Sequence, residues 1–109
     1  MIGIALMLAA AGNAPNFHTG NTLYAECTSE IGSAAYGVCT GYIEGIFDYD
    51  AVIQANLVRP VICTGPDATI ERLRDAVVQY LKDHPEARDQ AASTLINIAL
   101  HQAFPCPDP

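Results

Sequence analysis

The stretch TIERLRDAVVQYLKDHP, residues 69–85, carries the clearest helical pattern in the sequence. Its hydrophobic residues recur three or four positions apart and so share one face of a helix. They are Ile70, Leu73, Val77, Val78 and Leu81. Either Asp67 or Thr69 supplies the N-cap, and His84 with Pro85 ends the helix. One face of this helix is therefore expected to lie in a core.

Two helices are expected before this stretch. Residues 20–30 form a short helix, with Thr19 or Asn21 as its N-cap. Its apolar residues fall at steps of four: Leu23, Cys27 and Ile31. Ser33 then caps a second helix, which runs through residues 34–53 with an apolar pattern of helical period.

Three glycines lie in one line along this second helix. Gly37, Gly41 and Gly45 are spaced four residues apart, and each costs about 1 kcal/mol of helix propensity relative to Ala. We expect close approach of a neighbouring backbone to compensate, within the domain or across a dimer interface. The line is interpreted as a packing device, since no phosphate-loop context surrounds it.

A fourth helix is expected after residues 69–85. Pro85 suits its first position, where no backbone N–H is needed, and Pro105 ends it. No β alternation of useful length, internal repeat or second domain is visible. The predicted fold class is all-α, as a small disulfide-stapled bundle of about four helices.

Composition excludes several classes of function. The 109 residues contain 5 Lys and Arg against 12 Asp and Glu, for a net charge of -7. This chain lacks the basic surface that binds phosphates or anionic lipids, so nucleic acid is not an expected partner. Hydrophobic residues make up 50%, which indicates a chain that folds around a core.

The amino terminus has the features of an export signal. Residues 1–14 contain an uncharged apolar run of signal-peptide length, followed by small residues that a signal peptidase accepts. The run is too short for a stable membrane span, and no Lys or Arg precedes it. An amino-terminal core helix or strand is the alternative. We expect residues 1–14 to be a signal peptide, and residues 15–109 to be a single helical domain.

Four cysteines in a short chain with export features indicate two disulfides. Cys27, Cys39, Cys63 and Cys106 contain no Cys-x-x-Cys pair, which argues against a zinc site. Three connectivities are open, and the sequence does not decide between them. The pairing that we favour joins Cys27 to Cys39, at the ends of two successive helices, and Cys63 to Cys106.

No catalytic or metal-binding pattern is present. His18, His84 and His101 are scattered and belong to no known catalytic motif. Asp48 and Asp50 are two residues apart, so they face different ways on a helix, and no apolar pocket is implied that would raise one pKa. We expect no enzyme activity, no catalytic residues and no cofactor.

The irregular stretch from Asp48 to Pro66 is the candidate contact surface. Its mixture of aromatic, acidic and amide groups suits protein binding. The candidate partner-binding residues are Asp48, Tyr49, Asp50, Asn56, Leu57 and Arg59. Val58, Val61 and Ile62 are expected to form a short extended piece. The alternative is a solvated loop with a turn.

The order of motifs resembles that of the Tai-type immunity proteins of the Rap/Tai family. The resemblance runs from about Phe17 to Cys106. Besides the four cysteines, the positions that carry it are Gly41, Tyr42, Ile43, Gly45, Asp48, Tyr80, Leu81, His84, Pro85, Phe104 and Pro105. These residues are mostly apolar or glycine, so we interpret them as scaffold.

The resemblance implies a periplasmic, all-helical protein of a Gram-negative bacterium, often a homodimer. It implies an inhibitor that protects the cell from a type VI secretion amidase effector by blocking the amidase active site. A small periplasmic structural or chaperone-like helical protein, without a paired effector, is the alternative hypothesis. An amidase gene beside the gene for this chain would favour the first.

Overall fold

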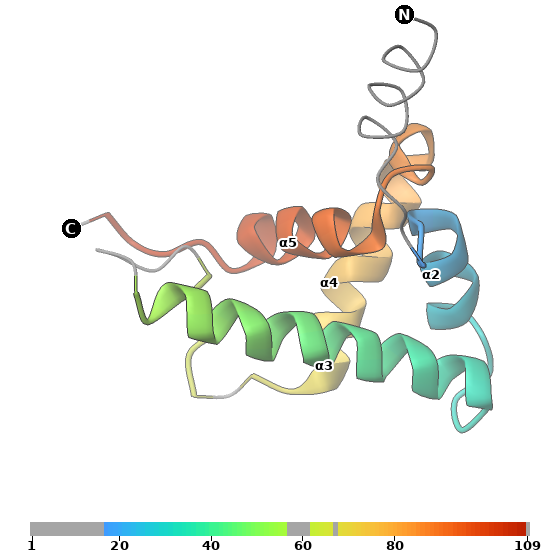
Figure 1. Cartoon of the computed structure of the whole chain (residues 1–109), viewed down its shortest axis with the longest axis horizontal. Coiled ribbons are helices and arrows are strands. Elements are labelled where there is room, and N and C mark those ends of the chain that lie inside the picture. The colour runs from blue at the N-terminus through green and yellow to red at the C-terminus, as the bar shows by residue number, and fades with distance from the viewer. Residues whose placement is uncertain (1–16, 57–61, 67, 109) are drawn as a thin grey trace, which may run out of the picture.

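The protein is described here from a computed structural model, which covers residues 17–56, 62–66 and 68–108. The expected signal peptide at residues 1–14 lies outside this part. The helices are α2 (Gly20–Cys27), α3 (Ala34–Gln54), α4 (Ile70–Asp83) and α5 (Ala92–Ala103), with a 3-10 turn, η1 (Pro85–Ala87). Figure 1 shows α3 and α5 on one side, α4 crossing behind them and α2 at one end. Each α helix contacts the other three, so the prediction of an all-α bundle is confirmed.

Three of the helices begin at a hydroxyl N-cap. The side chains of Thr19, Ser33 and Thr69 each accept a hydrogen bond from the backbone N–H three residues later, at 3.3, 3.1 and 3.3 Å. These bonds satisfy amides that would otherwise lack a partner. For two helices the sequence allowed two alternative N-caps. In the structure the N-caps of these helices are Thr19 and Thr69.

The fourth helix begins later than predicted, at Ala92 rather than Pro85. The intervening turn is held by the first residue of α2 and the segment before it. Gly20 N–H donates to the Gln90 carbonyl at 2.9 Å, and Ala92 N–H donates to the His18 carbonyl at 3.0 Å. Because these backbone groups bond to a distant segment, they are not available for a continuous helix. Pro85 opens only the short turn η1.

The first helix ends earlier than predicted, at Cys27. The hydroxyls of Thr28 and Ser29 donate to the carbonyls of Tyr24 and Ala25 in its last turn, at 2.6 and 2.8 Å. The chain then turns towards α3. Ile31, which the pattern placed on the apolar face, is instead 78% exposed, so that prediction was wrong.

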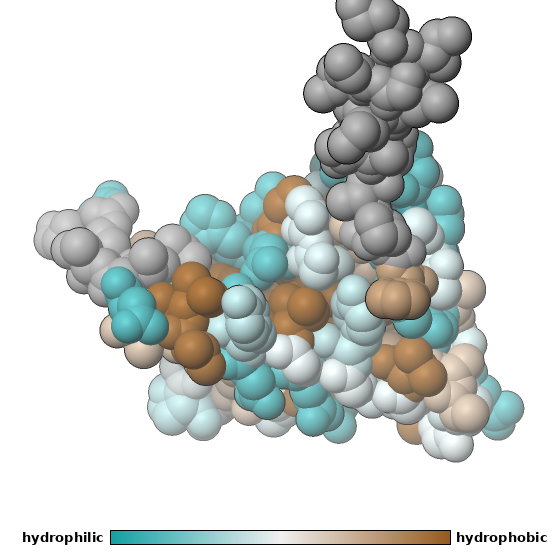
Figure 2. Space-filling view, viewed as in Figure 1, coloured by the Kyte–Doolittle hydropathy of each residue, from teal (hydrophilic) through white to brown (hydrophobic). Residues whose placement is uncertain are grey.

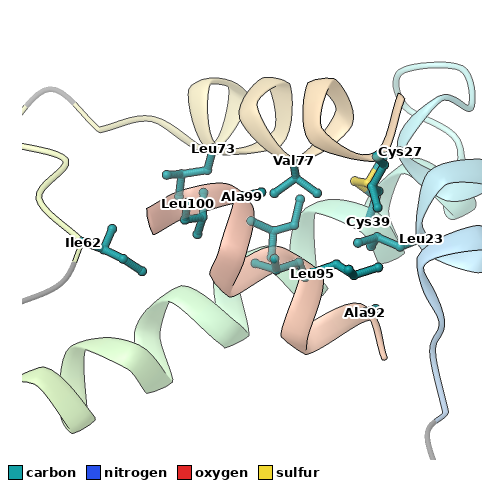
Figure 3. Packing of buried hydrophobic residues seen from close by; sticks show 13 residues of the cluster. Leu23, Cys27, Cys39, Ile62, Leu73, Val77, Ala92, Leu95, Ala99 and Leu100 are labelled. Carbon is teal, nitrogen blue, oxygen red and sulfur yellow. A yellow bond between two sulfur atoms is a disulfide. The ribbon is translucent and has the colours of Figure 1, made fainter. Parts of the chain in front are cut away.

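All four helices contribute to one hydrophobic core (Figure 3). Its buried residues are Leu23, Cys27, Cys39, Ile43, Ile62, Leu73, Val77, Leu81, Ala92, Leu95, Ile96, Ala99 and Leu100. The predicted apolar face of residues 69–85 supplies three of them, Leu73, Val77 and Leu81. That helix therefore lies against the core as its pattern indicated.

Two disulfides connect the elements, in the pairing that we favoured. Cys27 and Cys39 join α2 to α3 and are fully buried. Cys63 and Cys106 are partly exposed and join the segment before α4 to the segment after α5. Beside the second bridge, Cys63 N–H donates to the Phe104 carbonyl at 2.8 Å. The second bridge thus holds the carboxyl-terminal segment against the chain that follows α3.

The line of glycines on α3 meets no neighbouring backbone among the described residues. A Cβ added at Gly37, Gly41 or Gly45 would have nothing within 4 Å, so the expected close approach within the domain was wrong. Close approach occurs instead at Gly20, where an added Cβ would lie 2.5 Å from Leu95 Cδ1 and 2.8 Å from Arg88 Cα. In the described ranges, no helix is long and apolar enough to cross a membrane.

Candidate partner-binding site

The predicted contact residues Asp48, Tyr49 and Asp50 lie within the last two turns of α3, not in an irregular loop. The helix continues to Gln54, because Ile46 and Phe47 still pack against the core. Asn56 follows the helix and is exposed. Leu57 and Arg59, like Val58 and Val61 of the expected extended piece, lie outside the described residues.

One face of α3 is left uncovered by the other described helices. Its large hydrophobic side chains are exposed: Val38 by 44%, Tyr49 by 64%, Val52 by 60% and Ile53 by 42%. In Figure 2 hydrophobic residues on the corresponding side of the molecule alternate with polar ones. Exposed aromatic and aliphatic groups in a mixed surface are typical of a protein-binding site.

The charges on α3 are all negative. The helix carries Glu44, Asp48 and Asp50 and no Lys or Arg. Two described arginines serve packing elsewhere: Arg74 binds the Cys27 carbonyl, and Arg88 donates to the Leu81 carbonyl at 2.7 Å while its Cζ lies 4.0 Å from the centroid of the Tyr24 ring. The face of α3 is therefore acidic as well as partly apolar.

Asp50 differs from the other two acids because it lines a pocket between α3 and α5. The pocket has a volume of about 330 Å³, and its other lining residues are Ile62, Asn97, Ile98 and His101. The Oδ2 atom of Asp50 is buried and has no hydrogen-bond partner. Burial raises the pKa of this carboxyl above its usual range. The expectation that no apolar pocket would raise the pKa of either aspartate was thus wrong.

The α5 side of this pocket was missed by sequence reasoning. The sequence predicted a helix that includes Asn97, Ile98 and His101, but it gave no reason to place a binding site there. Positions 97 and 101 are one helical turn apart, which puts both side chains on one face. That spacing is a signal for a shared site only once the facing helix is known.

A second pocket, of about 240 Å³, lies between α4 and α5 and includes the motif residues Tyr80 and His84. Their rings lie 4.3 Å apart between centroids, and His84 Nδ1 lies 3.2 Å from Glu86 Oε1. Gln79 and Asp83 on the same wall already bind one another at 3.0 Å. The polar groups of this groove are therefore largely occupied.

The remaining motif residues serve mainly the scaffold. Tyr42 stacks on His18 at 4.7 Å, and Leu81 is fully buried. Phe104 packs on the core and lies beneath Arg72, 5.5 Å from its guanidinium carbon. Gly41, Gly45 and Asp48 are instead exposed, so these three belong to the uncovered face of α3.

The structure assembles no catalytic or metal constellation from the described residues. His18 Nε2 lies 3.0 Å from Glu26 Oε1, whereas His84 and His101 belong to different pockets. Groups of three or more His, Cys, Asp or Glu side chains that could hold a metal ion are absent from that part of the chain.

A comparison with protein families supports the resemblance. A family model described as that of the Rap1a immunity proteins matches residues 19–106. Comparisons with curated proteins and with solved structures gave no match.

Proposed function

The chain belongs to the Rap1a immunity protein family, and we propose that it protects a Gram-negative bacterium from a peptidoglycan amidase delivered by a type VI secretion system. In this proposal the protein acts in the periplasm. It binds one amidase and covers the active site, so that the amidase no longer reaches the cell wall. The family match over residues 19–106 is the observation that carries the proposal.

Two disulfides support a periplasmic site of action. Disulfides persist in oxidising compartments such as the bacterial periplasm and are rare in the cytosol. All four cysteines of this chain are paired. The apolar run within residues 1–14 provides the export signal that this location requires.

The surface of α3 supports an inhibitor that works by contact. Three carboxylates on α3, with no basic residue on that helix, favour a basic partner surface and speed the encounter with it. The exposed Tyr49 and Val52 supply the apolar area that such an interface needs. We therefore place Asp48, Tyr49 and Asp50, with Asn56, Leu57 and Arg59, at the interface with the amidase.

Co-expression tests this proposal directly. An amidase encoded next to this gene is exported to the periplasm of a laboratory host, alone or together with the full chain. Lysis by the amidase alone and survival with both proteins support immunity. Lysis that is unchanged when both are exported would overturn it.

Two controls separate immunity from other causes of survival. A chain without residues 1–14, which is retained in the cytoplasm, should not protect. Purified mature protein should inhibit the amidase on isolated peptidoglycan at a one-to-one ratio. Protection without inhibition in the purified system would favour the alternative, a chaperone-like protein that acts on the envelope in general.

The homodimer implied by the resemblance stays a prediction. Light scattering on the purified mature chain, run over a range of concentrations, measures its oligomeric state. A dimer is expected to bury apolar area. The glycine line of α3 would suit such an interface, because glycine has no Cβ and lets a second backbone approach closely.

A further inference from the structure

The pocket at Asp50 contains a polar atom that the fold leaves unsatisfied. Oδ2 of Asp50 is buried and has no hydrogen-bond partner among the described residues, although buried polar atoms are nearly always paired. A fold gains nothing from such an atom in isolation. The Asp50 carboxylate is therefore available to a donor group that enters the pocket.

The pocket suits a cation. Asp50 supplies a carboxylate within the last two turns of α3, a helix that carries no Lys or Arg. Among the described residues that line the pocket there is no Lys or Arg, and His101 is the one titratable side chain besides Asp50. The other described basic residues lie on α4 and just after η1.

The lining favours a guanidinium over a metal ion. Asp50 and His101 are too few side chains for a metal site, and no metal-ligating group of three is present in the described ranges. Ile62 and Ile98 provide apolar walls, on which the weakly hydrated face and the methylenes of an arginine side chain pack well. Asn97 offers an amide oxygen as a second acceptor.

The surroundings favour a protein as the source of that group. Ile53 follows Asp50 by one helical turn and is 42% exposed, and Tyr49 beside it is 64% exposed. Exposed aromatic and aliphatic side chains close in sequence to a charged group are typical of protein interfaces. We propose that the Asp50 pocket receives an arginine side chain of the partner protein, whose guanidinium binds the Asp50 carboxylate.

This inference rests on the proposed function only for the identity of the partner. The raised pKa of the Asp50 carboxyl supports it, because an entering cation would stabilise the charged form that burial now disfavours. The first test needs only the purified protein and no effector. A negative result would therefore refute the arginine pocket without refuting the proposal of immunity.

The experiment is a titration of the mature protein with acetyl-arginine amide, followed by NMR on the side-chain amide of Asn97. The neutral isostere acetyl-citrulline amide is the matched ligand control. We expect saturable shifts with the arginine compound, weak shifts with citrulline, and binding about tenfold weaker in Asp50→Asn. Asp89→Asn removes the same charge from an exposed site outside α3 and outside the proposed interface, and it should bind like the wild type.

Three results would overturn the proposal. One is the absence of saturable shifts in the wild type and in every variant. Another is equal loss of binding in D50N and D89N, which would indicate general attraction to an acidic surface. The third is binding seen only in Arg59→Gln, which would mean that the chain's own Arg59, the single basic residue between α3 and α4 in the sequence, already occupies the pocket.

Discussion

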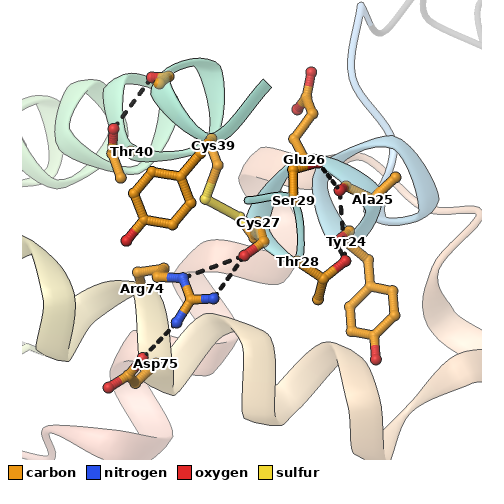
Figure 4. Close-up of a disulfide and its surroundings, with 12 residues drawn as sticks. Tyr24, Ala25, Glu26, Cys27, Thr28, Ser29, Cys39, Thr40, Arg74 and Asp75 are labelled. Carbon is orange, nitrogen blue, oxygen red and sulfur yellow. Dashed lines mark hydrogen bonds and ion pairs between the residues drawn. A yellow bond between two sulfur atoms is a disulfide. The ribbon is translucent and has the colours of Figure 1, made fainter. Parts of the chain in front are cut away.

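Arg74 donates two hydrogen bonds to the backbone carbonyl of Cys27, from Nε at 3.2 Å and from Nη2 at 2.7 Å (Figure 4). This carbonyl belongs to the last residue of α2, where an α helix leaves carbonyls without intrahelical partners. The side chain of Cys27 is bonded to Cys39 of α3. Arg74 of α4 therefore completes a junction of three helices at one residue.

Arg74→Lys is expected to destabilise the fold by about 1–2 kcal/mol, because an ammonium group does not reproduce the paired bonds of a guanidinium. Urea denaturation under non-reducing conditions measures this difference. Lys82→Met, on the exposed side of the same helix, serves as the control and should change stability by less than about 0.5 kcal/mol. Equal effects of the two substitutions would argue against the junction.

The exposed glycines of α3 predict stabilising substitutions. Gly41→Ala and Gly45→Ala should each raise the stability by about 1 kcal/mol, because alanine favours the helix and the added Cβ meets nothing within 4 Å. Thermal unfolding of the purified mature variants measures the gain at low protein concentration.

Gly20→Ala is the contrasting variant, since its Cβ would lie 2.9 Å or less from atoms of Arg88 and 2.5 Å from Leu95. It should lower stability by more than about 1 kcal/mol. A loss of stability in G41A at high concentration, together with a gain at low concentration, would indicate that the glycine line packs in a dimer.

The two disulfides are expected to be reduced in a fixed order. Cys63 and Cys106 are partly exposed, whereas Cys27 and Cys39 are fully buried, so a thiol reagent reaches the Cys63–Cys106 bridge first. Brief reduction in native conditions, followed by alkylation and mass analysis, should yield a species labelled only at Cys63 and Cys106. Labelling of Cys27 and Cys39 first would contradict the buried position of their bridge.

The helices were predictable from sequence wherever local signals agreed. Ser33 as an N-cap and the apolar face of residues 69–85 rest on near neighbours in the chain, which the sequence displays directly. The start of α5 was not predictable in this way. It depends on hydrogen bonds between the segment before α2 and residues about 70 positions later, such as that of Gly20 with Gln90, and no local pattern encodes them.

The candidate site was predictable only in part, for the same reason. Asp48, Tyr49 and Asp50 were found because acidic and aromatic groups gather there in the sequence. Asp48 is exposed and Asp50 is half-buried, and this difference depends on how α3 faces α5. Asn97 and His101 acquire a role only from that packing.

Asp50→Asn is expected to stabilise the protein at neutral pH by about 1 kcal/mol, because it replaces a half-buried charge, one oxygen of which is buried without a partner, by a neutral group. The gain should depend on pH. Burial raises the pKa of Asp50 in the folded state above the ordinary value of 3.8. The folded protein therefore keeps this proton to a higher pH than the unfolded chain does, and the carboxyl costs stability as pH rises between the two values.

The difference in stability between D50N and the wild type should accordingly be small at about pH 3 and reach its full size at about pH 7. Urea denaturation at both values measures it, with Asp48→Asn as the control for loss of an exposed charge. An equal gain at both values would mean that ionisation of Asp50 is not the cause. A substitution that stabilises the fold and weakens binding of the arginine probe about tenfold would show that Asp50 serves binding at a cost in stability.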